Sequence, residues 1–154
     1  MISNEKIKEI TFCSLDLETS GASPVTSKIV EIGIVKFTLS NFIDEYQTLI
    51  NPEIKIPYDV INIHGITNEM VKDAPVISDV IHDIYSFLKD SIMVIQNPRF
   101  DLSFLESTFI QYNLDVDKLV ALDTVRLAQK TFPNFENHKL GTLCSELQIE
   151  IEPH

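Results

Sequence analysis

The sequence predicts an α/β domain in which helices flank a mixed β-sheet. Three apolar runs rich in β-branched residues lie in the N-terminal third and are joined by short polar turns, as in an antiparallel meander. Further along, short apolar runs alternate with longer segments whose apolar residues recur at helical spacing. The chain is 44% hydrophobic and 23% charged, which is typical of a globular protein. We therefore expect one domain over residues 1–154.

The predicted meander consists of strands at 8–17, 28–38 and 43–50, and the Gly-, Pro- and Ser-containing run TSGASPVTS separates the first two. Side chains alternate between the faces of a strand. The first strand therefore presents one set of residues on one face and another on the opposite face: Ile10, Phe12, Ser14, Asp16 and Glu18 against Cys13, Leu15 and Leu17.

The central segment, 52–67, holds two prolines and has no clear periodicity, so we expect an extended loop. A short helix should follow from Thr67, whose hydroxyl can cap it. Apolar residues at helical spacing predict a helix over 76–88, with Pro75 in its first turn. The apolar run SIMVIQ at 91–96 predicts a short buried strand.

A helix is expected next, and it should run to about Tyr112. Asn97 should cap this helix, with Pro98 in its first position. A strand near 119–122 and helices over 123–131 and 138–149 follow. The last helix carries its apolar stripe at Leu140, Leu143 and Leu147.

Net charge and cysteine content restrict the classes of function. A formal charge of −11 argues against a broad phosphate-neutralising surface, but not against a substrate held through divalent cations. Cys13 and Cys144 fall in a predicted buried strand and a predicted helix, which indicates buried thiols and a reducing, cytoplasmic setting. The charged N-terminus lacks the apolar block of a signal peptide.

Three acids are candidates for a metal site. Asp16 and Glu18 share a face at the end of a strand, where they repel each other and lose hydration. Asp101 lies in the first turn of its helix, beside the inward-facing stripe, and can meet them. Carboxylate oxygens suit Mg²⁺ or Mn²⁺. Taken singly, each acid is also explained by a structural role, as an acid at a helix N-terminus or as a turn residue. Glu31 and Asp123 are expected to be structural.

Motifs along the chain, taken together, resemble those of a known family. The segments DLETSG, IVEIGIVKF, IHGIT, NPRFDLSFLE and HKLGTLCSELQI occur in this order. They are similar to the motifs of the DEDD-type 3′→5′ exonucleases, and above all to the proofreading exonucleases of bacterial replicative DNA polymerases. The resemblance covers the chain from Thr11 onward and implies a ribonuclease-H-like fold.

The resemblance implies roles for individual residues. Asp16, Glu18 and Asp101 match the family's catalytic, metal-binding acids, which hold two divalent ions, Mg²⁺ or Mn²⁺. Contacts to the terminal nucleotide are implied for three further residues: Leu17, Thr19 and His64. An ordinary loop histidine explains His64 equally well.

The family's third motif bears on the end of the chain. His154 matches its histidine, the general base, although a stray loop residue or the start of a purification tag are alternatives. The motif's last acid would lie five residues further on, so we expect the natural chain to continue. Gln96 and Pro98 depart from the family's second motif, and altered local packing is the expected effect.

These observations predict a metal-dependent 3′→5′ exonuclease that acts on the 3′ ends of single-stranded DNA and releases nucleoside 5′-monophosphates. A DNA polymerase subunit is an expected partner, and a membrane is not. Two alternatives stay open at this point. One is an exoribonuclease of the same fold, since sugar choice rests on contacts to the 2′-hydroxyl. The other is a module that binds 3′ ends or a polymerase without cutting.

Overall fold

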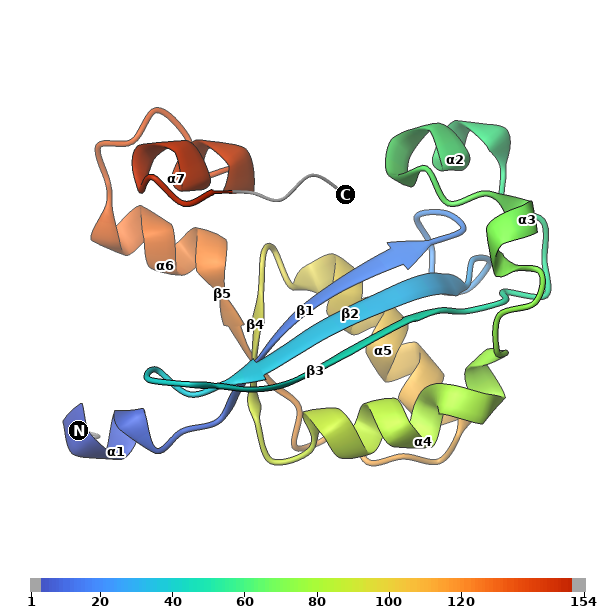
Figure 1. Cartoon of the computed structure of the whole chain (residues 1–154), viewed down its shortest axis with the longest axis horizontal. Coiled ribbons are helices and arrows are strands. Elements are labelled where there is room, and N and C mark those ends of the chain that lie inside the picture. Colours follow the sequence, from blue (N-terminus) through green and yellow to red (C-terminus); the bar gives the residue numbers. More distant parts are fainter. Residues whose placement is uncertain (1–3, 151–154) are drawn as a thin grey trace.

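The computed structural model describes residues 4–150 and is built on a five-stranded sheet with the order β3-β2-β1-β4-β5 (Figure 1). The first three strands pair antiparallel, whereas β4 and β5 run parallel to β1. This arrangement confirms the predicted mixed sheet. The strands are β1 (Phe12–Thr19), β2 (Ile29–Phe37), β3 (Phe42–Leu49), β4 (Ile92–Ile95) and β5 (Val120–Asp123).

The first strand begins later than predicted. Residues 8–11 do not belong to β1, and Lys8 is the last residue of a short helix, α1 (Asn4–Lys8). The segment NEKIK lacks the alternation of a half-buried strand and is rich in residues that tolerate a helix well. The strand prediction was therefore wrong at this end, while the predicted bounds of β2 and β3 are correct to within a residue.

Two helices cover one face of the sheet and close the main core. These are α4 (Ile77–Leu88) and α5 (Arg99–Gln111), both drawn below or behind the sheet in Figure 1. The inward side chains of β1 pack with residues of both helices: Cys13, Leu15, Leu17, Ile81, Ile84, Phe104, Leu105 and Phe109. Burying each large apolar side chain stabilises the fold by roughly 1.5–3 kcal/mol. The core therefore fixes β1 against the start of α5.

The other face of β1 carries polar residues, as the alternation predicts. Ser14 and Asp16 are exposed and Glu18 is half-buried, whereas Leu15 and Leu17 between them are buried. This confirms the predicted assignment of faces. It also places both acids of the first motif away from the main core.

The segment expected to be an extended loop contains a helix, so that prediction was wrong. Helix α2 (Tyr58–His64) begins after Pro57 and has no buried residue, which is why no apolar stripe marks it. It ends at Gly65, whose φ of 79° is left-handed and whose N–H donates to the Ile61 carbonyl. In Figure 1, α2 and α3 lie at the end of the sheet toward which the β1 arrow points.

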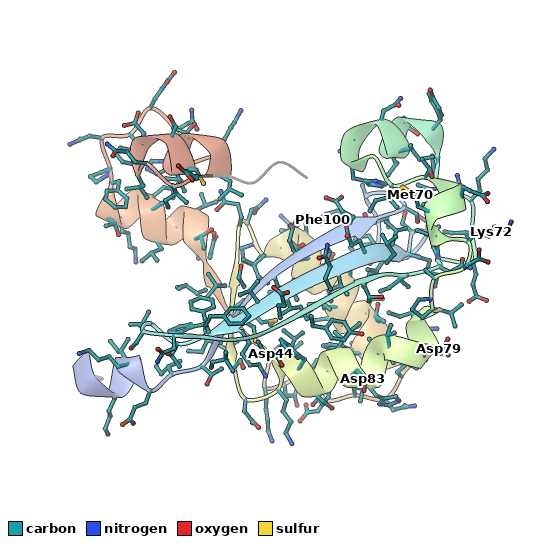
Figure 2. All side chains as sticks on the ribbon, in the orientation of Figure 1. Asp44, Met70, Lys72, Asp79, Asp83 and Phe100 are labelled. Carbon is teal, nitrogen blue, oxygen red and sulfur yellow. The ribbon has the colours of Figure 1, made fainter. Side chains whose placement is uncertain are left out.

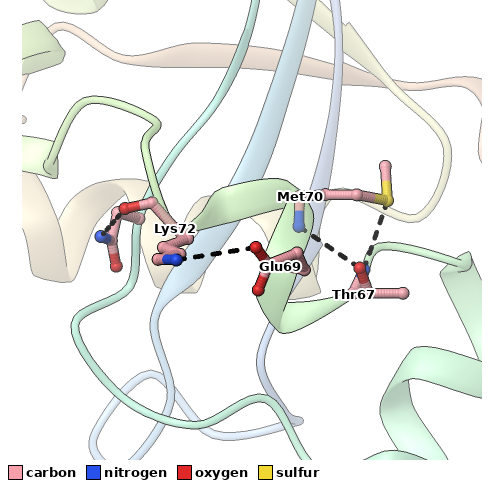
Figure 3. A network of polar contacts seen from close by, with 5 residues as sticks. Thr67, Glu69, Met70 and Lys72 are labelled. Atoms are coloured by element: carbon pink, nitrogen blue, oxygen red, sulfur yellow. Dashed lines mark hydrogen bonds and ion pairs between the residues drawn. The ribbon is translucent and has the colours of Figure 1, made fainter.

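The short helix predicted after this segment is present as α3 (Asn68–Val71). The hydroxyl of Thr67 accepts a hydrogen bond from the N–H of Met70 at 3.3 Å, as expected of a capping residue (Figure 3). Pro75 lies ahead of α4 and not in its first turn, because the residue that precedes the helix is Val76.

The second half of the chain follows the prediction with two corrections. Asn97 adopts a left-handed φ of 58° and does not cap α5, because Pro98 occupies the position before Arg99. Helix α6 (Thr124–Thr131) follows β5, and α7 (Leu140–Glu146) comes last. Leu143 and Cys144 are buried, but Leu140 and Leu147 are exposed, so the predicted leucine stripe is only partly used.

The prediction of buried thiols is confirmed. Cys13 and Cys144 are free, buried thiols. Within the described part of the chain, no helix has the length and hydropathy that crossing a bilayer requires.

Substituting Gly65 by Ala is expected to destabilise the fold by about 1 kcal/mol, because a Cβ disfavours the left-handed conformation. Gly141 is the matched control, since it lies inside α7 and a Cβ there meets no neighbour. Gly141→Ala should instead stabilise by roughly 0.5–1 kcal/mol. Urea denaturation measures both. A Gly65→Ala variant as stable as the parent would mean that α2 does not end as described.

Candidate active site

Asp16 and Glu18 lie where β1 loses its neighbour on one side. Strand β1 pairs with β2 along its whole length, but with β4 only from Phe12 to Ser14. Beyond Ser14, the backbone groups of β1 that face β4 are not used by that ladder. A buried N–H without a partner is costly, so another group is expected to meet them.

The carboxylate of Asp101 meets one of these groups. It accepts hydrogen bonds from the backbone N–H of Leu17 and from its own N–H, and only 6% of the residue is exposed. Helix α5 starts four residues after β4 ends, so its first turn is brought directly against the open edge of β1. Asp101 thereby sits against the backbone between Asp16 and Glu18. The helix N-terminus also favours a carboxylate in this turn.

The three acids influence one another electrostatically. The pKa of Asp101 is raised from 3.8 to about 6, first because burial removes water from the carboxylate. The negative charges of Asp16 and Glu18 raise it further, while the two backbone N–H donors oppose the shift. Residues distant in sequence therefore form one electrostatic unit. Across residues 4–150, however, no group of three His, Cys, Asp or Glu side chains is arranged as a metal site. The ligand set remains a prediction.

Two other acids have structural roles. Glu31 lies directly opposite Glu18 in the antiparallel pair, and its carboxylate accepts a hydrogen bond from the Gln47 side-chain amide at 3.1 Å. Asp123 caps α6 by accepting from the N–H groups of Val125 and Arg126. Both observations agree with the structural readings of these residues.

Leu17 and Thr19, which were predicted to contact the substrate, have side chains that interact within the protein. The side chain of Leu17 is part of the main core, and its backbone N–H is used by Asp101. The hydroxyl of Thr19 donates to the Gly21 carbonyl at 2.8 Å and so closes the turn after β1. Either residue can reach a ligand only through backbone groups or a rearranged turn.

His64 ends α2 and has an unusual hydrogen-bonding state. Its Nδ1 accepts from the N–H of Ile66 at 3.0 Å, so in the neutral ring Nε2 carries the proton. Nε2 is buried and finds no hydrogen-bond partner among the described residues. An unmet buried donor costs about 1–3 kcal/mol, which makes this atom a candidate for a ligand contact.

Phe100 is a further candidate for the site, and the sequence did not single it out. It is 37% exposed although it directly precedes the buried Asp101, and its ring packs on Phe104 with centroids 5.1 Å apart. In Figure 2 it lies above the sheet near the start of α5. Its only sequence signal was its place within the NPRFDLSFLE motif. His154 lies outside the described residues.

Gln96, which departs from the family's second motif, has a local structural role. Its side-chain amide donates to the His138 carbonyl at 3.0 Å, and its oxygen accepts from the Thr124 hydroxyl. Gln96 thus links the end of β4 to the start of α6 and to the segment before α7. That its packing differs from the family's stays a prediction.

Comparison with known proteins gives a match along nearly the whole chain. A family model described as Exonuclease (RNase_T) matches residues 13–154. The DNA polymerase III PolC-type of Bacillus subtilis (strain 168) is 35% identical over 150 residues, which is 96% of this chain and 10% of that protein. The PolC-type polymerase of Oceanobacillus iheyensis is 34% identical over 151 residues, or 98% of this chain and 11% of that protein. The chain therefore spans about a tenth of the length of these curated relatives.

Solved structures share the fold at lower sequence identity. Exonuclease X in complex with 5′ overhanging duplex DNA superposes with a TM-score of 0.72 at 24% identity, covering 93% of this chain and 76% of that one. A zinc-bound E. coli exonuclease I–single-stranded DNA complex gives a TM-score of 0.80 at 18% identity, covering 92% and 36%. At such identities the likeness is one of fold, and it confirms the predicted ribonuclease-H-like arrangement.

Proposed function

The chain belongs to the exonuclease family, and from that premise we propose that it removes nucleotides from the 3′ ends of single-stranded DNA and releases nucleoside 5′-monophosphates. The observation that supports this most is the electrostatic coupling of Asp101 with Asp16 and Glu18. Acids that repel one another at the open edge of a strand destabilise the fold unless cations offset their charge. Phosphodiester hydrolysis is a reaction that such cations assist.

The proposed cofactors are two Mg²⁺ or Mn²⁺ ions, held by Asp16, Glu18 and Asp101. The donor set fits these metals, because it consists of carboxylate oxygens. The charges of Asp16 and Glu18 also add to burial in raising the pKa of Asp101, so the three acids lie close enough to interact. A cation would draw the carboxylates together by replacing repulsion with attraction. When bound, such ions stabilise the charge on the attacking and leaving oxygens of a phosphodiester.

The chain's own residues would position the terminal nucleotide. Phe100 offers an exposed ring on which a base can stack, an interaction worth about 1–3 kcal/mol per base. The Nε2–H of His64 is buried and has no partner among the described residues, so it could donate to the sugar or phosphate only after the groups that cover it move. His154 is the proposed general base, because an imidazole with an ordinary pKa near 6.5 can take a proton from water near neutral pH.

The biological setting is proposed from the relatives. Because the chain is similar to a segment of PolC-type polymerases, we propose that it acts on 3′ ends during DNA replication, as a proofreading activity beside a polymerase. The free, buried thiols fit a cytoplasmic location.

The direct test uses single-stranded DNA labelled at either end. With Mg²⁺ or Mn²⁺, a 3′ label should be released at once as a mononucleotide, while a 5′-labelled strand shortens in steps. Excess chelator should stop both processes. Release of the 5′ label first, or unchanged cleavage in chelator, would contradict the proposal. The same oligonucleotide made as RNA tests for an exoribonuclease, and binding without cleavage in metal would indicate a non-catalytic module.

A further inference from the structure

Gly33 occupies a central position beside the proposed site. It pairs directly with Asp16 across the β1–β2 ladder and with Gln47 across the β2–β3 ladder. Directly opposed residues of antiparallel strands project to the same face, with Cβ atoms about 4.5–5.5 Å apart. The row Asp16–Gly33–Gln47 therefore crosses the polar face of the sheet with no side chain at its centre.

Neither the backbone nor the neighbouring residues require a glycine here. A Cβ at Gly33 would meet no atom within 4 Å among the described residues, and φ is outside the left-handed region that favours glycine. A glycine inside a strand weakens it and often marks a place where a ligand approaches the backbone closely. The chain thus accepts a local loss of stability directly opposite a proposed metal ligand.

We propose that Gly33 keeps the surface beside Asp16 open so that the phosphate to be cut can lie over β2. This inference rests on the proposed function, because the phosphate reaches the site only through ions that Asp16 helps to hold. A phosphate bound through ions that Asp16 helps to hold would come close to the Asp16 carboxylate. A valine at position 33 would occupy that space, and an alanine would occupy part of it.

The test compares Gly33→Ala and Gly33→Val with Val35→Ile. Val35 lies on the same strand and the same face, about 7 Å further along, opposite Ser14, and is 40% exposed. Titration calorimetry in Mn²⁺ measures the binding of thymidine 5′-monophosphate, and thermal unfolding measures stability. Gly33→Val should weaken nucleotide binding at least tenfold, with Gly33→Ala in between and Val35→Ile unchanged. The midpoint of unfolding should stay equal or rise in both Gly33 variants.

Failure of the inference is distinguishable from failure of the proposed function. If the parent protein binds no nucleotide in Mn²⁺ and cuts no DNA, the proposed function is wrong. If the parent binds nucleotide and both Gly33 variants bind it equally well, only the role of Gly33 is overturned. A lowered unfolding midpoint in Gly33→Ala with unchanged nucleotide affinity would make the glycine a packing requirement and also overturn it.

Discussion

Replacing Asp16 by Asn should lower the rate of nucleotide release by about 10³-fold or more without unfolding the protein. The substitution keeps the shape of the side chain but removes the charge that holds a cation. Metal ions contribute several kcal/mol to such reactions, and each 1.36 kcal/mol is a factor of ten in rate. Asp16 is exposed and lies outside the main core, so no packing is lost. Relief of repulsion toward Asp101 should raise stability slightly.

Asp44→Asn is a matched control for this experiment. It makes the same change of charge at an exposed position on β3, away from the end of β1 (Figure 2). Its cleavage rate and Mn²⁺ affinity should equal those of the parent, whereas Asp16→Asn should lose both. In addition, the pKa of Asp101 should fall in Asp16→Asn, because the charge of Asp16 raises it. An Asp16→Asn variant with near-parental turnover would remove Asp16 from the metal ligands.

Elements with a buried face were predictable from local patterns. The alternation of β1 placed Asp16 and Glu18 opposite Leu17, and the helical register of α5 placed Asp101 toward the sheet, as the structure confirms. Helix α2 was missed because apolar periodicity marks only helices that have a buried face, and none of the residues of α2 is buried. Periodicity also assigned Leu140 and Leu147 to an inward stripe, although both are exposed.

The details of the site depend on facts that no local pattern contains. The Leu17 N–H is available to Asp101 because the β1–β4 ladder stops at Ser14, and that depends on the register of two strands far apart in sequence. The contact between Gln96 and His138 joins residues 42 positions apart. The placement of Gly33 directly opposite Asp16 depends on the register of the β1–β2 pair. The residue types of the site and the approach of Asp101 to the other two acids were predictable, but the individual hydrogen bonds were not.

In the absence of divalent ions, the contribution of Asp101 to stability should fall as pH rises from about 4 to about 6. Its pKa is about 6 in the folded protein, against an ordinary value of 3.8. Below pH 4 the carboxyl is protonated in both the folded and the unfolded state. Between the two pKa values the folded state retains a proton that the unfolded state has lost, so raising the pH favours unfolding. A shift of about two pKa units corresponds to roughly 3 kcal/mol.

Asp101→Asn isolates this contribution, because its amide oxygen can still accept from the N–H of Leu17 but no longer ionises. Urea denaturation in chelator between pH 4 and pH 7 should show the variant gaining on the parent by up to roughly 3 kcal/mol as pH rises. Mg²⁺ or Mn²⁺ should reverse the order above pH 6, because a cation binds the parent, with its ionised Asp101 carboxylate, more tightly than the variant and so stabilises the parent more. Metal affinity of the parent should accordingly rise with pH up to about 6. If the difference between the two proteins does not change with pH, Asp101 ionises as an ordinary surface acid, and the electrostatic unit on which the proposed function rests does not exist.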